Sequence, residues 1–179
     1  MGESLSFRAP LQRVKATNFL SLEEIEVELG GLNVLVGPNG SGKTNFLNIF
    51  SFIGAIADSD LMPAINRFGG VEGISFQNSP SNTITISISG TITRLSHKNA
   101  QDEYKLQFEA RPIRPRSADI VFRHEELRFK RLKGKGRRIT IGDTNLEIFD
   151  RSTRKKNRKR RCKRNDEWLS AFASSWKKI

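Results

Sequence analysis

The sequence predicts an α/β fold with a mixed β-sheet, an antiparallel β subdomain and a basic tail. Three observations lead to this prediction. A short apolar segment, Leu32–Val36, runs directly into a glycine-rich loop, and a helix-patterned segment follows that loop. Segments in which apolar and polar residues alternate then occupy the middle of the chain. Beyond Asp150 the composition becomes abruptly basic.

The first sixty residues contain three predicted strands and one predicted helix. Leu11–Phe19 alternates loosely, and Glu24–Leu29 alternates cleanly, with glutamates on one face and Ile, Val and Leu on the other. Leu32–Val36 is mostly apolar, which is typical of a strand buried on both faces at the centre of a mixed sheet. After the loop, apolar residues at helical spacing predict a helix of about four turns; these are Phe46, Ile49, Phe50, Ile53 and Ala57.

The middle of the chain is predicted to form an antiparallel meander beside the mixed sheet. Ile84–Ile88 and Tyr104–Ala110 each alternate between apolar and polar residues, with a polar turn between them at Ser96–Asn99. Two weaker strands are expected next. They are residues 120–130 and 138–148, joined by a glycine-containing hairpin loop at residues 133–136.

Composition limits the domain organisation. The 179 residues carry a net charge of +12, but residues 1–150 hold 19 Lys/Arg against 17 Asp/Glu, whereas residues 151–179 hold 12 against 2. The basicity therefore belongs to a tail and not to the predicted folded body. We expect one folded domain at 1–150, a basic disordered linker at 151–165 and a short amphipathic helix at 166–179.

The loop after the third predicted strand has the pattern G-x-x-x-x-G-K-[ST] of a phosphate-binding loop, or Walker A motif. Its context is as that motif requires, with a strand before it and a helix after it. The competing interpretation is a glycine-rich turn that caps an ordinary helix. The predicted nucleotide-binding residues are Gly37, Pro38, Asn39, Gly40, Ser41, Gly42, Lys43, Thr44 and Asn45.

Each residue type in this loop has a physical task in binding ATP. Glycines allow backbone conformations that turn successive N–H groups towards phosphate oxygens, and the helix N-terminus adds partial positive charge. Lys43 is expected to reach the β- and γ-phosphates, and the Thr44 hydroxyl is expected to be a ligand of Mg²⁺. The predicted cofactors are therefore ATP and Mg²⁺.

The sequence of residues 37–45, Gly-Pro-Asn-Gly-Ser-Gly-Lys-Thr-Asn, resembles the P-loop of ABC-type ATPases. The resemblance is particularly to the RecF/SMC-like branch, which includes OLD-type ATPases. Residues 14–22 resemble the N-terminal strand and Asn-Phe-x-Ser element of that branch, and Arg67–Ile74 resembles a segment after its P-loop helix. The resemblance implies the N-terminal lobe of a P-loop NTPase. Many relatives carry a basic or polar residue where this chain has Leu20, which leaves no nucleotide contact to expect there.

The resemblance also implies motifs that this chain lacks. A strand ending in Asp-Glu would assist Mg²⁺ and position the attacking water, and a Ser-Gly-Gly signature would cap the γ-phosphate from a second subunit. Glu125-Glu126 is the nearest acidic pair, and we assign it to the antiparallel subdomain. No catalytic residue is assigned. The chain is expected to bind ATP, whereas hydrolysis requires a second lobe, a dimer or a partner chain.

The basic tail leaves several interpretations open. Arg151–Arg164 could contact the phosphates of DNA or RNA without sequence preference, act as an address signal, or have no specific role. An altered reading frame would produce the same change of composition. Trp168, Phe172 and Trp176 lie four residues apart and could dock on a partner. The RecF/SMC-like relatives act on DNA, so the resemblance implies a role in DNA repair or anti-phage defence.

The alternative function from another class is a nonspecific nucleic-acid-binding module with a vestigial P-loop. No apolar run approaches the roughly 20 residues that span a bilayer, so no membrane partner is expected. The single cysteine, Cys162, is compatible with a reducing compartment, and a cytoplasmic location is expected. His97 and His124 have no second ligand at metal-binding spacing and are expected at the surface.

Overall fold

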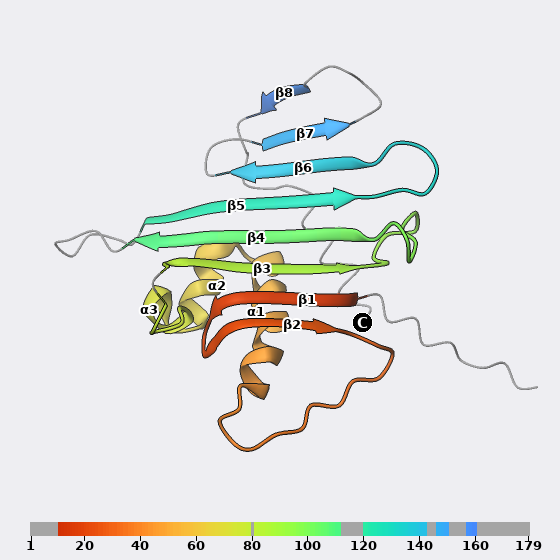
Figure 1. Ribbon diagram of the computed structural model, residues 1–179. Coiled ribbons are helices and arrows are strands. Elements are labelled where there is room, and N and C mark those ends of the chain that lie inside the picture. Colours follow the sequence, from red (N-terminus) through yellow and green to blue (C-terminus); the bar gives the residue numbers. More distant parts are fainter. Residues whose placement is uncertain (1–10, 80, 112–119, 143–145, 151–156, 161–179) are drawn as a thin grey trace, which may run out of the picture.

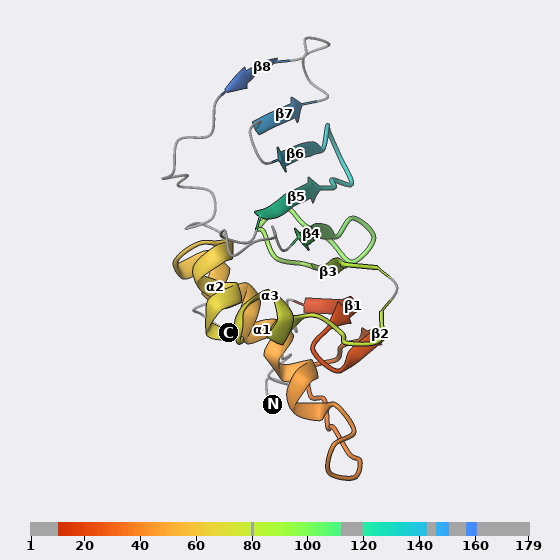
Figure 2. The same cartoon turned by 90° about the vertical axis from the view of Figure 1, so that its left-hand side faces the viewer.

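The computed structural model describes residues 11–79, 81–111, 120–142, 146–150 and 157–160. In these residues one eight-stranded sheet carries three helices on one of its faces (Figures 1 and 2). The strands are ordered β2-β1-β3-β4-β5-β6-β7-β8. Their bounds are β1 Leu11–Phe19, β2 Leu22–Glu28, β3 Thr83–Gly90, β4 Asp102–Arg111, β5 Ile120–Phe129, β6 Arg137–Gly142, β7 Leu146–Asp150 and β8 Asn157–Arg160.

Every pairing between neighbouring strands is antiparallel, so the expected mixed sheet is wrong for the described residues. The expected meander is also not a separate subdomain, because β3 pairs with β1 on one side and β4 on the other. Among the described strands, the only crossover joins β2 to β3 through the three helices. These helices are α1 Lys43–Asp58, α2 Leu61–Arg67 and α3 Gly70–Ile74.

The central strand expected at Leu32–Val36 does not form. This segment belongs to no strand, and the Leu32, Val34 and Val36 side chains are 86%, 76% and 89% exposed. Its apolar residues made it look like a buried strand, but a strand needs a neighbour with which to exchange backbone hydrogen bonds. No described strand lies beside it. Figure 2 shows the connection from β2 to α1 projecting away from the sheet.

The remaining differences between the sequence-based expectations and the structure lie mainly at the C-terminal edge of the sheet. The long strand expected at 138–148 is two strands, β6 and β7, which pair with each other in antiparallel fashion. Four residues of the segment expected to be a disordered linker form β8, which pairs with β7. Backbone hydrogen bonding at a sheet edge does not require apolar side chains, which explains a strand in so basic a segment. The helix expected at 166–179 lies outside the described residues.

The hydrophobic core lies between the helices and the inner face of the sheet. In β3, Ile84, Ile86 and Ile88 point inward and are at most 1% exposed, while the residues between them are partly exposed. Across from them α1 buries one stripe of apolar side chains at helical spacing. That stripe consists of Phe46, Ile49, Phe52, Ile53 and Ile56.

Four phenylalanines hold the layers together. The Phe52 ring lies 5.5 Å from Phe19 of β1, 5.8 Å from Phe108 of β4 and 5.4 Å from Phe68 after α2, measured between ring centroids. These tilted and edge-on geometries are those that aromatic pairs prefer. Phe52 therefore fixes the position of α1, and with it the start of the helix at the glycine-rich loop.

Candidate nucleotide-binding site

The glycine-rich loop leads from the extended segment into α1. Gly37, Pro38, Asn39, Gly40 and Ser41 are exposed in the loop, Gly42 is the N-cap of α1, and Lys43, Thr44 and Asn45 form its first turn. The helix begins with the hydrogen bond from the Phe46 backbone N–H to the Gly42 carbonyl, at 2.8 Å. The strand expected before the loop is absent, whereas the helix expected after it is confirmed.

Two glycines of the loop have backbone conformations that other residues adopt only with strain. Gly40 has φ +83° and Gly42 has φ +86°, both in the left-handed region. A Cβ at Gly42 would also lie 3.1 Å from Leu22 Cδ2. A left-handed glycine therefore stands directly before the first helical turn, whose backbone N–H groups are free. This order of conformations is that of an anion-binding backbone nest.

The Lys43 side chain folds back over the loop. Its Nζ donates hydrogen bonds to the carbonyl oxygens of Gly37, at 2.8 Å, and Pro38, at 2.6 Å. The Ser41 hydroxyl lies 3.3 Å from the same nitrogen. Three loop acceptors thus hold the ammonium group over the loop. These hydrogen bonds fix the position of the positive charge above the loop backbone.

The β1–β2 turn supports the start of α1. Asn45 Nδ2 donates to Ser21 Oγ at 2.5 Å, so this amide serves the turn. Leu20, with φ +53°, donates its backbone N–H to the Ile74 carbonyl at 2.7 Å. The sequence reasoning missed Ser21 and Leu22 as residues that shape the loop. Their proximity could not be inferred because twenty or more positions separate them from Gly42 and Asn45 in the sequence.

The residues present fit ATP and Mg²⁺. For phosphate, the loop offers an ammonium group held by backbone carbonyls, left-handed glycines and helix N–H groups. For a metal ion, the exposed Thr44 carries a hydroxyl in the first helical turn. Within the described residues, no group of three His, Cys, Asp or Glu side chains could hold a metal by itself. Mg²⁺ would therefore depend on Thr44, water and the phosphates themselves. His97 and His124 are exposed, as expected.

Glu125 and Glu126 lie in β5, within the antiparallel sheet, as expected. They point to opposite faces. Glu125 is fully buried on the helix side of the sheet and forms an ion pair with Arg123. The Nη1 atom of Arg123 also lies 2.6 Å from Oδ1 of Asp60, which is the N-cap of α2. Burial and the nearby Glu125 charge raise the pKa of Tyr104 well above its usual value. This cluster fastens α2 to the sheet and contains no group directed at the P-loop.

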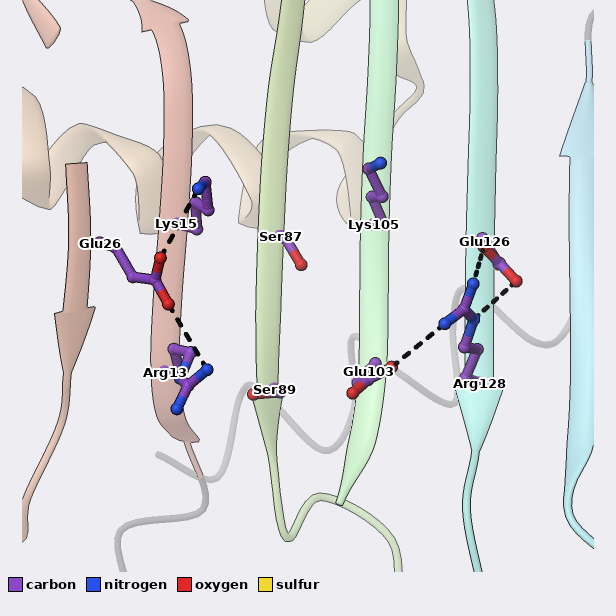
Figure 3. Close-up of a pocket in the computed structure, with 9 residues that line it drawn as sticks. All are labelled: Arg13, Lys15, Glu26, Ser87, Ser89, Glu103, Lys105, Glu126 and Arg128. Carbon is purple, nitrogen blue, oxygen red and sulfur yellow. Dashed lines mark hydrogen bonds and ion pairs between the residues drawn. The ribbon is translucent and has the colours of Figure 1, made fainter. Parts of the chain in front are cut away.

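The outer face of the sheet carries a shallow depression of about 340 Å³ (Figure 3). Short serine side chains, Ser87 and Ser89 of β3, form its floor between charged residues of the neighbouring strands. Apart from Lys105, these charged residues form ion pairs within the described part of the chain. The ion pairs include Arg13–Glu26 at 3.4 Å, Lys15–Glu26 at 3.6 Å and Arg128–Glu126 at 2.7 Å. The depression is therefore largely self-neutralised and stabilises strand register.

The outer-face ion pairs make stability depend on pH. The hydrogen bond from Arg128 lowers the pKa of Glu126 below its usual 4.5, with the charges of Arg128 and Arg138 acting in the same direction. A carboxyl with a lowered folded-state pKa stabilises the fold above its unfolded pKa, and that contribution is lost as pH falls through the folded value. We expect the melting temperature of Glu126→Gln to fall less than that of the wild type on acidification below pH 4.5. An identical acid dependence would contradict this.

Comparison with known proteins agrees with the loop geometry. A protein-family model described as "AAA domain, putative AbiEii toxin, Type IV TA system" matches residues 32–166, more than half of the chain. An "OLD nuclease" from Thermus scotoductus is 38% identical over 58 residues. That match covers 32% of this chain and 10% of the relative, so the chain spans a small part of the relative's length. With the P-loop inside the matched residues, the chain belongs to this family of AAA domains and carries the nucleotide-binding loop of a P-loop ATPase.

Proposed function

We propose that the chain binds Mg²⁺-ATP through Gly37–Asn45 and acts as the N-terminal lobe of a RecF/SMC-like ATPase. The observation that carries the proposal is the position of Lys43, whose ammonium group is held by loop carbonyls beside left-handed glycines and the N-terminus of α1. This geometry suits electrostatic capture of a triphosphate. It also favours ATP binding over the alternative of a nucleic-acid module with a vestigial P-loop.

The exposed segment Leu32–Val36 supports a requirement for a second lobe or partner chain. Burying a side chain such as Leu or Val contributes roughly 1.5–3 kcal/mol, and this segment leaves Leu32, Val34 and Val36 almost fully in solvent. Within the described part of the chain no backbone hydrogen bond joins it to a strand. A strand from a second lobe would pair with this segment and bury it directly before the P-loop.

Hydrolysis needs groups beyond those that bind phosphate. Positioning the attacking water and stabilising the transition state require a carboxylate and further donors near the γ-phosphate. The two buried acids of the described residues, Asp102 and Glu125, are instead engaged by Arg131 and Arg123 in the antiparallel sheet. The catalytic groups therefore come from the second lobe, a dimer or a partner chain.

We place this ATPase in DNA repair or defence against phage. The support is the resemblance of the P-loop and its flanks to the RecF/SMC-like branch, together with the match to a relative whose name describes a nuclease. The basic segment Arg151–Arg164 is a further means of contacting DNA. A cytoplasmic location is part of the same proposal. Within the described residues no helix is long and apolar enough to cross a membrane.

The proposal is tested by measuring binding and turnover on the same purified chain. Isothermal titration is expected to show ATP binding that weakens when Mg²⁺ is chelated, because the metal neutralises the phosphates. Phosphate release by the isolated chain is expected to stay at the buffer background. Absence of ATP binding would refute the proposed site. Sustained hydrolysis that co-purifies with the chain would refute the need for a second lobe.

A further inference from the structure

The β5–β6 hairpin carries an excess of positive charge on the folded body, apart from the tail. Residues 128–138 contain seven Lys or Arg in eleven positions and no acid. A concavity of about 440 Å³ lies along this hairpin. Six of the cations line it, namely Arg128, Lys130, Arg131, Lys135, Arg137 and Arg138.

Only part of this charge is neutralised. Three carboxylates at the base of the hairpin, Asp102, Glu103 and Glu126, make ion pairs with four of the cations. The seven cations outnumber these three acids, and Asp150 of β7 lies opposite Arg137 in the sheet. Lys133 and Lys135 at the tip are exposed and have no ion-pair partner among the described residues. The base of the hairpin is therefore fixed by ion pairs, while its tip presents cations to solvent.

Strand register concentrates the charge further. Arg128 of β5 lies directly opposite Arg138 of β6, and both arginines contact the same carboxylate, Glu126, at 2.7 Å and 3.2 Å. Glu103 also lies 3.8 Å from Arg128, but it pairs with Lys130 as well, so two carboxylates serve three cations. Like charges directly opposite each other in a sheet destabilise the pair. An additional anion in the concavity would relieve this repulsion.

The backbone of the β5–β6 loop requires glycine at two positions of its tip. Gly134 has φ +84°, which places it in the left-handed region. At Gly136 a Cβ would come within 2.6 Å of the Phe129 carbonyl oxygen, so the turn back into β6 requires glycine. Around these residues Arg131 stacks over the Phe129 ring at 5.7 Å and reaches buried Asp102 at 2.9 Å. The glycine conformations and the contacts of Arg131 thus fix the shape of the hairpin and its position on the sheet.

We propose that the hairpin Arg128–Arg138 binds the phosphate backbone of a nucleic acid without sequence preference. Lysines and arginines along a concave surface can contact a curved row of phosphates in a nucleic acid. A protein that binds a flat anionic bilayer would instead present a convex or planar face with several apolar residues. Leu132 is the one large exposed apolar side chain within the hairpin. This nucleic-acid contact lies on the folded body, is separate from the segment Arg151–Arg164 and does not depend on ATP binding.

The test compares two double variants of the full chain by fluorescence anisotropy, with labelled duplex DNA, single-stranded DNA and RNA over a range of salt concentrations. K133E/K135E reverses the two tip lysines. R67E/K105E reverses two exposed cations on α2 and on the middle of β4, also without ion pairs among the described residues. Each variant lowers the net charge of +12 by four, and each retains the basic tail. Melting temperatures check that both fold.

We expect K133E/K135E to bind at least about tenfold more weakly than the wild type near 0.1 M salt, with a shallower slope of log affinity against log salt by about two. R67E/K105E should lose less than about threefold. The arm with the strongest wild-type binding identifies the preferred nucleic acid. Equal losses in the two variants would overturn the proposal, as would no binding by the wild type. Binding to phosphatidylserine vesicles that depends on the hairpin while DNA and RNA binding does not would also overturn it.

Discussion

Lys43→Ala is expected to reduce binding of Mg²⁺-ATP below detection in titration calorimetry. The substitution removes the ammonium group that the loop holds against the Gly37 and Pro38 carbonyl oxygens, at 2.8 Å and 2.6 Å. Truncating one partner of an enclosed charge pair costs about 2–5 kcal/mol in binding, which lowers affinity by at least about thirtyfold. The loop also loses the hydrogen bonds that fix its shape.

Lys98→Ala is the matched control for this measurement. Lys98 is an exposed lysine in the β3–β4 connection, and its removal changes the net charge of the protein by the same amount. We expect its ATP affinity to remain within about twofold of the wild type, because exposed charges at a distance are screened by salt. If Lys43→Ala bound ATP as well as Lys98→Ala, the P-loop would not be the nucleotide site.

Phe52→Ala is expected to give the largest loss of stability of any single truncation in the core. Phe52 is fully buried and contacts phenylalanine rings from β1, β4 and the segment after α2. Truncation of a buried Phe costs about 3–5 kcal/mol through lost transfer free energy and the cavity left behind. Domains are stable by about 5–15 kcal/mol in total, so the urea midpoint should fall by a large fraction.

Phe50→Ala provides the comparison within the same helix. Phe50 is only partly buried and makes an edge-on contact with Phe46 at 5.5 Å. We expect it to cost about 1 kcal/mol, near the centre of the distribution for single substitutions. Equal urea midpoints for the two variants would show that Phe52 does not join the layers. If Phe52→Ala proves insoluble, Phe52→Leu should still unfold at lower urea than Phe50→Leu.

Local patterns predicted those parts of the fold whose partners are near in sequence or whose period is regular. The 3.6-residue spacing of Phe46, Ile49 and Ile53 placed α1, and strict alternation placed β3 and β4. The glycine and lysine positions of the P-loop were predicted because its chemistry requires those residues in a fixed order. None of these inferences needed knowledge of distant contacts.

The errors arose where burial or pairing depends on other segments. The apolar character of Leu32–Val36 indicates that the segment can be buried, but it does not say which segment covers it. The strand expected at 138–148 was divided because β6 and β7 pair with each other. Gly142 and the Asp-Thr-Asn that follows it are residue types that favour a turn, a signal that interrupts the alternation of the segment. The Ser21–Asn45 contact joins segments whose proximity only the tertiary fold creates.

The exposed segment before the P-loop also affects how the isolated chain behaves in solution. Leu32–Val36 contains no charge and no proline, and three of its side chains are at least 76% exposed. Extended segments of this composition pair readily with identical segments of other molecules, which leads to edge-to-edge aggregation. The isolated chain is therefore best handled dilute. A concentration-dependent increase in light scattering would come from the same five residues that a second lobe would cover.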